Sequence, residues 1–343
     1  MKGATIALDE LNGREAAALV VDGRLEDLFL DGGGALPGTI YRGVAGRPMK
    51  GQGGIFFDTP DGSAYLRQIK GISPGEARIL QVTGFAEPGK AIPVTDRVLF
   101  KSRYAIVTPG APGINVSKAI KDDEMRDALR GLAREVFDSE DGLILRSSCA
   151  GADEEDVAED IRQMAELSKA AMADASGGAE VLVEGDGAHA RAWREWTMRA
   201  EVDRDAGSFE RHGVLDAIDA LGAADVPLGG GASMAVELTR ALVAVDVNTG
   251  GDTSPAAGLK ATIAALRELP RQLRLRGLGG LVTVDPAPIP KKERKQIEQV
   301  LRAALKTDSV ETNFAGWTPM GNLELQRKRD RPALAEILRG GAQ

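Results

Sequence analysis

Two aspartates in the second half of the chain have the surroundings that a metal-dependent hydrolysis requires. Asp246 follows the apolar run LVAV, and Asp285 follows LVTV. Each pattern predicts a buried strand with a carboxylate at its C-terminal end, which is where sheet proteins place their sites. Two such carboxylates can hold Mg²⁺ through oxygen and leave positions for water and a phosphate oxygen. The competing interpretation is that both aspartates are turn residues that cap helices.

Few other residues offer chemistry. The single cysteine, Cys149, excludes an intramolecular disulfide and any CxxC-type zinc site, and two histidines, His189 and His212, leave little for histidine chemistry. Carboxylates must therefore carry any hydrolytic catalysis, and we expect Cys149 to be a structural thiol. The net charge of −8 argues against a nonspecific polyanion binder, so nucleic-acid binding has to be local.

The composition is that of a globular protein with several modules. A chain of 343 residues exceeds what one core usually organises, and 43% apolar with 27% charged residues is ordinary. The first residues, MKGATIALDE, contain no apolar leader, and no stretch approaches the roughly 18 apolar residues of a membrane helix. We expect a cytoplasmic protein.

The first half of the chain alternates short strand patterns with turns. Residues 5–30, with a turn at Asp22-Gly23, predict a β-hairpin. Five short strands separated by Gly and Pro between 38 and 98 predict an OB-type barrel. Residues 104–147 read as strand, helix and strand, with the helix near 122–137.

Helices and strands alternate in the second half. A helix is predicted over 153–173, followed by a polar stretch to Arg211 without a clear pattern. Ser254-Pro255 reads as an N-cap and first-turn proline of a helix that runs to about Arg267, with a kink or restart at Pro270. Pro290 opens a further helix. The two aspartates thus end two strands.

The strings AVDVNTGGD and RQLRLRGLGGLVTVD resemble the catalytic core of the ribonuclease E/G family, in the same order and at nearly the same spacing. NLELQRKRDRP, and more faintly GLILRSS and TIYRGV, extend this resemblance, which is strong over 232–332. In the family the two aspartates bind one magnesium and an asparagine helps to hold the site. The matching residues are Asp246, Asp285 and Asn248, with Mn²⁺ as a substitute metal.

The resemblance implies a multidomain fold of α/β and β parts. An RNase H-like segment is interrupted by an OB-type (S-one-like) barrel and an α/β 5′-sensor insert, and a DNase I-like catalytic domain follows. The expected ranges are 1–36 and 153–208 for the RNase H-like segment, 37–98 for the barrel, 99–152 for the sensor and 209–343 for the catalytic domain.

The resemblance also implies two RNA contacts outside the metal site. Phe56, Tyr65 and Lys90 match barrel residues that meet single-stranded RNA, where stacking tolerates any base. The alternative is that the aromatics belong to the barrel core, and strand alternation lets only one of Phe56 and Phe57 face outward.

Arg146 and Ser147 match an Arg–Thr pair that recognises a 5′-monophosphate, and Ile106 and Ser102 match its opposite wall. A serine stands at position 102 where the family has glycine. An arginine can grip a terminal phosphate with two hydrogen bonds, although an exposed arginine is more often only solvated.

Several features depart from the family. The loop after Asn248 is shorter, Pro286 and Pro288 follow the second aspartate, and the CPxCxG zinc-link is absent. We therefore expect no structural zinc and a monomer or weak homodimer. The basic segments 291–295 and 326–331 either follow the RNA backbone or are solvated.

These observations predict a Mg²⁺-dependent endoribonuclease that cleaves single-stranded RNA to 5′-phosphate and 3′-hydroxyl ends, in RNA processing or decay. The alternative is a catalytically weakened RNA-binding regulatory protein of the same fold. A third possibility is a phosphodiesterase that acts on DNA or small nucleotides.

Overall fold

The computed structural model describes residues 3–47, 53–67, 71–87, 89–254 and 256–340. The chain forms two compact units. Unit 1 contains Met1–Gly32 and Ala200–Gln343, and unit 2 contains Gly33–Arg199. Each unit holds two β-sheets with their own helices.

The first sheet of unit 1 is a meander of three antiparallel strands with a fourth strand added in parallel. Its members are β1 (Ala4–Leu11), β2 (Arg14–Val21), β3 (Arg24–Leu30) and β14 (Glu201–Asp203), in the order β14-β1-β2-β3. Two-residue turns at Asn12-Gly13 and Asp22-Gly23 have positive φ at both positions, as tight hairpins require. The predicted hairpin with its turn at Asp22-Gly23 is therefore confirmed as β2–β3, and a second hairpin, β1–β2, precedes it.

Short helices complete the core under this sheet. They are α4 (Ser208–Arg211), α5 (Val214–Ala220) and α8 (Leu334–Gly340). Phe209, Ile218 and Ile337 from these helices share one cluster of buried residues with Ala18 and Leu28 of the strands.

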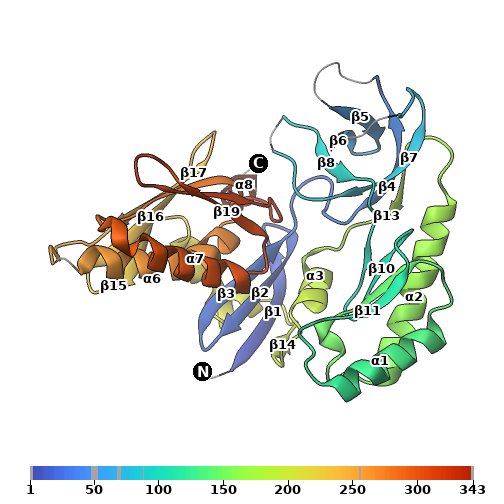
Figure 1. The fold of residues 1–343 in the computed structure, drawn as a ribbon, viewed down its shortest axis with the longest axis horizontal. Coiled ribbons are helices and arrows are strands. Elements are labelled where there is room, and N and C mark those ends of the chain that lie inside the picture. Colours follow the sequence, from blue (N-terminus) through green and yellow to red (C-terminus); the bar gives the residue numbers. More distant parts are fainter. Residues whose placement is uncertain (1–2, 48–52, 68–70, 88, 255, 341–343) are drawn as a thin grey trace. The chain divides into compact units, whose positions relative to one another are not determined.

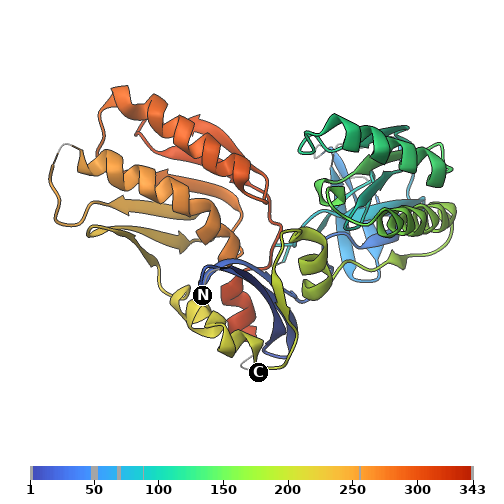
Figure 2. The ribbon, with the colours of Figure 1, turned by 90° about the horizontal axis from the view of Figure 1, so that it is seen from below.

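The second sheet of unit 1 carries both aspartates. Its strand order is β15-β16-β17-β18-β20-β19, and β17 and β18 are its one parallel pair among the described residues. Helices α6 and α7 lie against one face of the sheet (Figures 1 and 2). The bounds are β15 (Asp225–Gly229), β16 (Ala232–Leu238), β17 (Val243–Asn248), α6 (Ala257–Leu275), β18 (Gly280–Asp285), η2 (Lys291–Glu293), α7 (Arg294–Thr307), β19 (Thr312–Trp317) and β20 (Leu323–Arg327).

Helix α6 lacks the predicted break between Arg267 and Pro270. It continues through Pro270 and ends at Leu275, close to Gly277, which has a φ of 63°. Proline removes one helical hydrogen bond, but the fully buried Leu269 and Leu273 hold both sides of Pro270 in the core. The described helix begins at Ala257; the first-turn role predicted for Pro255 lies outside the described residues.

Unit 2 contains the predicted OB-like barrel. Five strands follow the order β4-β5-β6-β8-β7, and β7 pairs with β4 to close the barrel. A sixth strand, β13, which the sequence did not reveal, adds to β4, and the buried Arg42 reaches from β4 to Asp174 and Glu180. The bounds are β4 (Ile40–Ala45), β5 (Gly54–Thr59), β6 (Gly62–Arg67), β7 (Ala77–Val82), β8 (Ile92–Thr95) and β13 (Glu180–Val183).

The second sheet of unit 2 has the order β11-β12-β10-β9. Helices α1 and α2 share its buried core, and the predicted helices near 122–137 and over 153–173 are confirmed. None of the described helices, α2 included, is long and apolar enough to cross a bilayer. The bounds are β9 (Phe100–Lys101), β10 (Ala105–Thr108), β11 (Gly113–Val116), α1 (Asp123–Val136), β12 (Gly142–Leu145), η1 (Ser147–Cys149), α2 (Glu154–Ala173) and α3 (Ala188–Glu195).

Candidate functional site

Asp246 and Asp285 are direct neighbours on the parallel strands β17 and β18. In the register of this pair, Asp246 lies beside Asp285, and both residues are exposed. Adjacent strands are about 4.8 Å apart, so the two carboxylates can reach one shared ligand. The sequence predicted each aspartate at a strand end. Asp285 does end β18, whereas β17 continues two residues beyond Asp246 to Asn248, and the fold brings the two aspartates together.

Strand alternation determines the face on which these aspartates lie. Val245 and Val284, one position earlier in each strand, are buried in the core with α6 and α7. Side chains next to them must point to the opposite side of the sheet. The carboxylate pair therefore lies on the face of the sheet that these helices leave open.

Asn248 shares this face because it follows Asp246 by two positions. Its Nδ2 donates a hydrogen bond to Oδ2 of Asp246, with the two atoms 2.8 Å apart. The amide therefore fixes the orientation of one carboxylate. Its own side-chain oxygen adds a further hard donor on the same face.

The donors fit a hard, partly hydrated cation. Carboxylate and amide oxygens suit Mg²⁺, which keeps several waters and needs one or two protein carboxylates. Within the described part of the chain, no group of three or more His, Cys, Asp or Glu side chains forms a potential metal cage. This pair is too open for a tetrahedral structural zinc site, which takes four nitrogen or sulfur ligands.

The barrel presents an aromatic pair on its outer surface. Phe56 of β5 and Tyr65 of β6 are paired in register, half-buried, with ring centroids 4.9 Å apart and planes inclined by 45°. The neighbouring Phe57 is fully buried, which confirms that only one of the two phenylalanines faces outward. A Cβ at Gly54 would lie 2.5 Å from the Tyr65 hydroxyl, so glycine is what lets this ring lie across β5.

Lys90 stands just before β8, the strand next to β6 in the barrel. Its ammonium group is exposed and pairs with Glu87 at 2.8 Å. An exposed pair of this kind contributes little to stability. Lys90 is therefore available to an anionic ligand at low cost.

Arg146 follows β12, and its guanidinium already has several hydrogen-bond partners within the protein. Its Nη1 donates to the backbone carbonyls of Ser102, Arg103 and Arg194, and its Nη2 contacts Glu195 at 2.8 Å. The side chain is 16% exposed. Arg146 therefore ties the β9–β10 turn to the end of α3.

The residues predicted to accompany Arg146 are nearby. Ile106 pairs with Ile144 of β12, which lies two positions before Arg146 and so on the same face. Ser147 is exposed at the start of η1, and the Ser102 hydroxyl donates to Asp160. The fold brings Arg146, Ile106 and Ser102 together, with Ser147 next to Arg146 in the chain.

Glu195 is the residue of this region that the sequence did not reveal. Lys101, Arg146 and Arg194 all contact its carboxylate at 2.7 to 2.8 Å, and we call these four residues the Glu195 cluster. Burial alone would raise the pKa of Glu195, but the three cations lower it to about 2. Burial lowers the pKa of Lys101, against the opposite effect of Glu195. Glu195 is therefore the anion on which these three cations converge.

A cation–π pair lies beside this cluster. The guanidinium of Arg103 is 4.0 Å from the centre of the Trp193 ring, and Trp193 is 59% exposed. These partners are 90 positions apart in the chain, so no local pattern could have identified them.

The two basic segments, 291–295 and 326–331, differ in the burial of their side chains. In 291–295 the lysines are exposed, which both the RNA-backbone and the solvated-face interpretations require. In 326–331, Arg327 and Arg331 are buried, so these two arginines cannot follow an RNA backbone along the surface. Cys149 is also buried, and burial raises the pKa of its thiol to about 11, as expected of a structural thiol.

Known proteins resemble this chain over most of its length. The model of the family described as "Ribonuclease E/G family" matches residues 100–204 and 194–330. Ribonuclease G of Salmonella typhimurium (strain SL1344) is 25% identical over 368 residues, which cover 88% of this chain and 74% of that protein. Ribonuclease G of Escherichia coli (strain K12) is 26% identical over 367 residues, with the same shares. Ribonuclease E of Nostoc sp. (strain PCC 7120 / SAG 25.82 / UTEX 2576) is 24% identical over 383 residues, 94% of this chain and 56% of that protein. The chain belongs to the ribonuclease E/G family.

Proposed function

We propose that this protein is a Mg²⁺-dependent endoribonuclease that hydrolyses single-stranded RNA in the cytoplasm, in RNA processing or decay. The observation that carries the proposal is the side-by-side register of Asp246 and Asp285 on the open face of the sheet. Membership of the ribonuclease E/G family supports RNA as the substrate.

The site residues have two roles, which are metal binding and orientation of a metal-binding carboxylate. Asp246 and Asp285 would each supply a carboxylate oxygen to the metal, and Asn248 keeps Asp246 in place through its hydrogen bond. Bound Mg²⁺ would supply a water of lowered pKa and would neutralise charge that develops on the phosphate. Water oxygen bonds to phosphorus, the bond from phosphorus to the 3′ oxygen breaks, and that oxygen takes a proton. The products carry 5′-phosphate and 3′-hydroxyl ends.

The outer surface of the barrel is proposed to bind the RNA strand. Phe56 and Tyr65 offer ring faces to successive bases, and Lys90 meets the backbone. Stacking of this kind contributes about 1–3 kcal/mol per base and tolerates any sequence. A local surface of this type is compatible with the net charge of −8.

Recognition of the 5′ end is proposed for Arg146, Ser147 and Ile106. Because Arg146 already contacts Glu195, a 5′-phosphate has to replace that carboxylate as its anionic partner. RNA with a 5′-monophosphate should therefore be cut faster than RNA with a 5′-hydroxyl, and Arg146→Lys, which lacks a two-pronged donor, should remove the difference. Equal rates on both substrates for the parent protein would contradict this role.

We propose that these roles follow the domain division expected from the family. Residues 37–98 form the RNA-binding barrel, 99–152 the sensor, 209–343 the DNase I-like catalytic part, and 1–36 with 153–208 the RNase H-like part. We propose a monomer or weak homodimer, which light scattering tests directly.

Digestion of one labelled RNA and a DNA of the same sequence, with and without Mg²⁺, tests the proposed function. RNA cleavage that requires Mg²⁺ and leaves 5′-phosphate ends is expected. Equal cleavage of DNA would contradict the substrate class. RNA binding without cleavage at any Mg²⁺ or Mn²⁺ concentration would favour a regulatory RNA-binding protein instead.

A further inference from the structure

Segment 291–306, which contains η2 and α7, concentrates positive charge within an acidic protein. It has six basic and two acidic side chains, a net charge of +4, whereas the whole chain carries −8. The rest of the chain therefore carries −12. A local reversal of this kind is the electrostatic signature of a surface that binds a polyanion. The six basic residues are Lys291, Lys292, Arg294, Lys295, Arg302 and Lys306.

These six cations have no counter-ion within the protein. None of them forms an ion pair with a residue that the structure describes. By comparison, Arg130 on α1 pairs with Asp127 at 2.7 Å. Arg302 and Lys306 instead lie four positions apart on α7, a spacing at which like charges repel and destabilise a helix. An external anion would relieve this repulsion.

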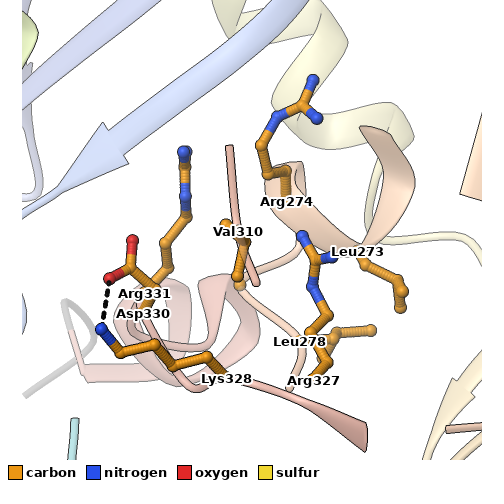
Figure 3. A pocket seen from close by; sticks show the side chains of 9 residues that line it. Leu273, Arg274, Leu278, Val310, Arg327, Lys328, Asp330 and Arg331 are labelled. Atoms are coloured by element: carbon orange, nitrogen blue, oxygen red, sulfur yellow. Dashed lines mark ion pairs between the residues drawn. The ribbon is translucent and has the colours of Figure 1, made fainter. Parts of the chain in front are cut away.

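The other basic segment, 326–331, has counter-ions of its own. Arg327 pairs with the buried Asp308, and Lys328 pairs with Asp330 at 3.9 Å. Figure 3 shows Arg327, Lys328 and Asp330 around one small pocket, with the pair of Lys328 and Asp330 at its side. The structure thus separates two basic segments that the sequence left equivalent.

Two aromatic rings of β19 hold arginines of α7. The guanidinium of Arg294 lies 4.5 Å from the centre of the Trp317 ring, and that of Arg302 lies 5.1 Å from the centre of the Phe314 ring. A guanidinium that rests on a ring still has its N–H groups at its edges, where they can donate to a phosphate. Both arginines are therefore positioned before a ligand arrives, which lowers the entropy cost of binding.

The one carboxylate of α7 contacts a ring instead of a cation. Glu298 is four positions after Arg294 and three after Lys295, and opposite charges at these spacings can pair on a helix. Its Oε1 instead accepts a hydrogen bond from Nε1 of Trp317, with the two atoms 2.8 Å apart. Glu298 thus fixes the ring that supports Arg294 and leaves Lys295 without a partner on the helix.

Three exposed cations form one line along α7, which we call the α7 basic surface. They are Lys295, Arg302 and Lys306, at positions i, i+7 and i+11. At 3.6 residues per turn, the second and third lie within about 20° of the first, and the line is roughly 16 Å long. Ile297 and Leu301 of the same helix are buried in the core. The α7 basic surface therefore faces away from the sheet.

We propose that the α7 basic surface binds the phosphate backbone of RNA outside the cleavage site; this inference rests on RNA as the proposed substrate. Helix α7 packs on the face of the sheet opposite Asp246 and Asp285, so the RNA on α7 is not the part that meets the metal. Lys291 follows Asp285 by six positions, so η2 connects the end of β18 to α7. RNA can pass around this end of the sheet. Contacts to phosphates add affinity without a sequence preference.

The salt dependence of RNA binding tests this surface. Labelled single-stranded RNA is titrated in EDTA, where it stays uncut, and its fluorescence anisotropy is followed at several salt concentrations. Each phosphate contact adds about 0.7 to the slope of log affinity against log salt. The triple variant Lys295→Gln, Arg302→Gln and Lys306→Gln should therefore lower this slope by about 2, and weaken binding about 10- to 100-fold at 0.1 M salt.

Two controls separate position and charge from other effects. Lys118→Gln, Lys121→Gln and Lys169→Gln together remove the same charge from exposed positions of unit 2, and this variant should keep the parent slope. Arg302→Lys keeps the charge and changes the contact with Phe314, so it should also keep the slope.

The outcomes distinguish this inference from the proposed function. Failure of the parent protein to bind RNA would overturn both. Binding by the parent with an equal slope in the α7 triple variant, or an equal loss of slope in the unit 2 control, would overturn the α7 basic surface alone. Phosphatidylglycerol vesicles that bind the parent but not the α7 variant, at an unchanged RNA slope, would assign the surface to lipid headgroups instead.

Discussion

Replacing Glu195 by glutamine removes the anion on which Lys101, Arg146 and Arg194 converge. The carboxylate contacts all three cations at 2.7 to 2.8 Å, and its side chain is 24% exposed. Glutamine keeps the size and one acceptor oxygen but not the charge. The change therefore isolates the electrostatic contribution of the Glu195 cluster.

The pKa of Glu195 gives the size of the effect. It falls from 4.5 to about 2, because the three cations outweigh the opposing effect of burial. A shift of about 2.5 units at 1.36 kcal/mol per unit corresponds to about 3 kcal/mol, and partial exposure reduces this to roughly 2 kcal/mol. Since the folded pKa is the lower one, this stability is fully present above pH 4.5 and is lost as the pH falls toward 2.

Urea unfolding followed by tryptophan fluorescence measures this difference, because Trp193 and Trp196 flank Glu195. Glu195→Gln should be less stable than the parent by about 2 kcal/mol at pH 7, and by less than half of that at pH 3. Glu166→Gln, at an exposed position of α2, is the control and should change little. Equal stability of Glu195→Gln and the parent at pH 7, or a difference that does not depend on pH, would refute the ion-pair assignment.

Three further changes test other parts of the structure. Asp308→Asn should lower the free energy of unfolding in urea by about 3–5 kcal/mol, since it leaves two buried guanidinium groups without their shared carboxylate; a loss under about 1 kcal/mol would contradict this pairing. Phe56→Ala or Tyr65→Ala should weaken binding of single-stranded RNA in fluorescence anisotropy by about 1–3 kcal/mol, while Phe57→Ala should instead destabilise the barrel by about 3–5 kcal/mol. Cys149 should react slowly with a thiol reagent at pH 8 and rapidly in urea, because burial raises its pKa to about 11; fast reaction of the folded protein would contradict its burial.

Local sequence patterns predicted those features that depend on a single strand, helix or turn. The alternation around Asp246 and Asp285 predicted two strands with exposed aspartates beside buried valines, and the structure has both, although β17 runs on to Asn248. The turn at Asn12-Gly13 carried an equally clear pattern, since Asn-Gly between apolar runs is a strong hairpin indicator. The turn at Asn12-Gly13 could therefore have been predicted from the sequence.

The features that could not be predicted from the sequence depend on tertiary contacts or on elements too short to show a pattern. Helix α6 continues through Pro270 because the surrounding leucines are buried, which propensity alone does not reveal. Glu195 and Arg146 are 49 positions apart, so no spacing rule joins them. Between 174 and 211 the elements are β13, α3, β14 and α4, with four, eight, three and four residues, too short to establish a period.

The central claim is that Asp246 and Asp285 together hold the catalytic metal, and one cleavage measurement tests it most directly. Asp246→Asn and Asp285→Asn keep the side-chain shape but remove a charged ligand, so each should lower the rate of Mg²⁺-dependent RNA cleavage at least about 100-fold, or roughly 2.7 kcal/mol, and leave RNA binding in a gel shift nearly unchanged. Asp225→Asn, at an exposed aspartate of β15 in the same sheet, should cut at the parent rate. If either of the first two variants cuts within about tenfold of the parent, a loss under ~1.4 kcal/mol, the metal is held elsewhere.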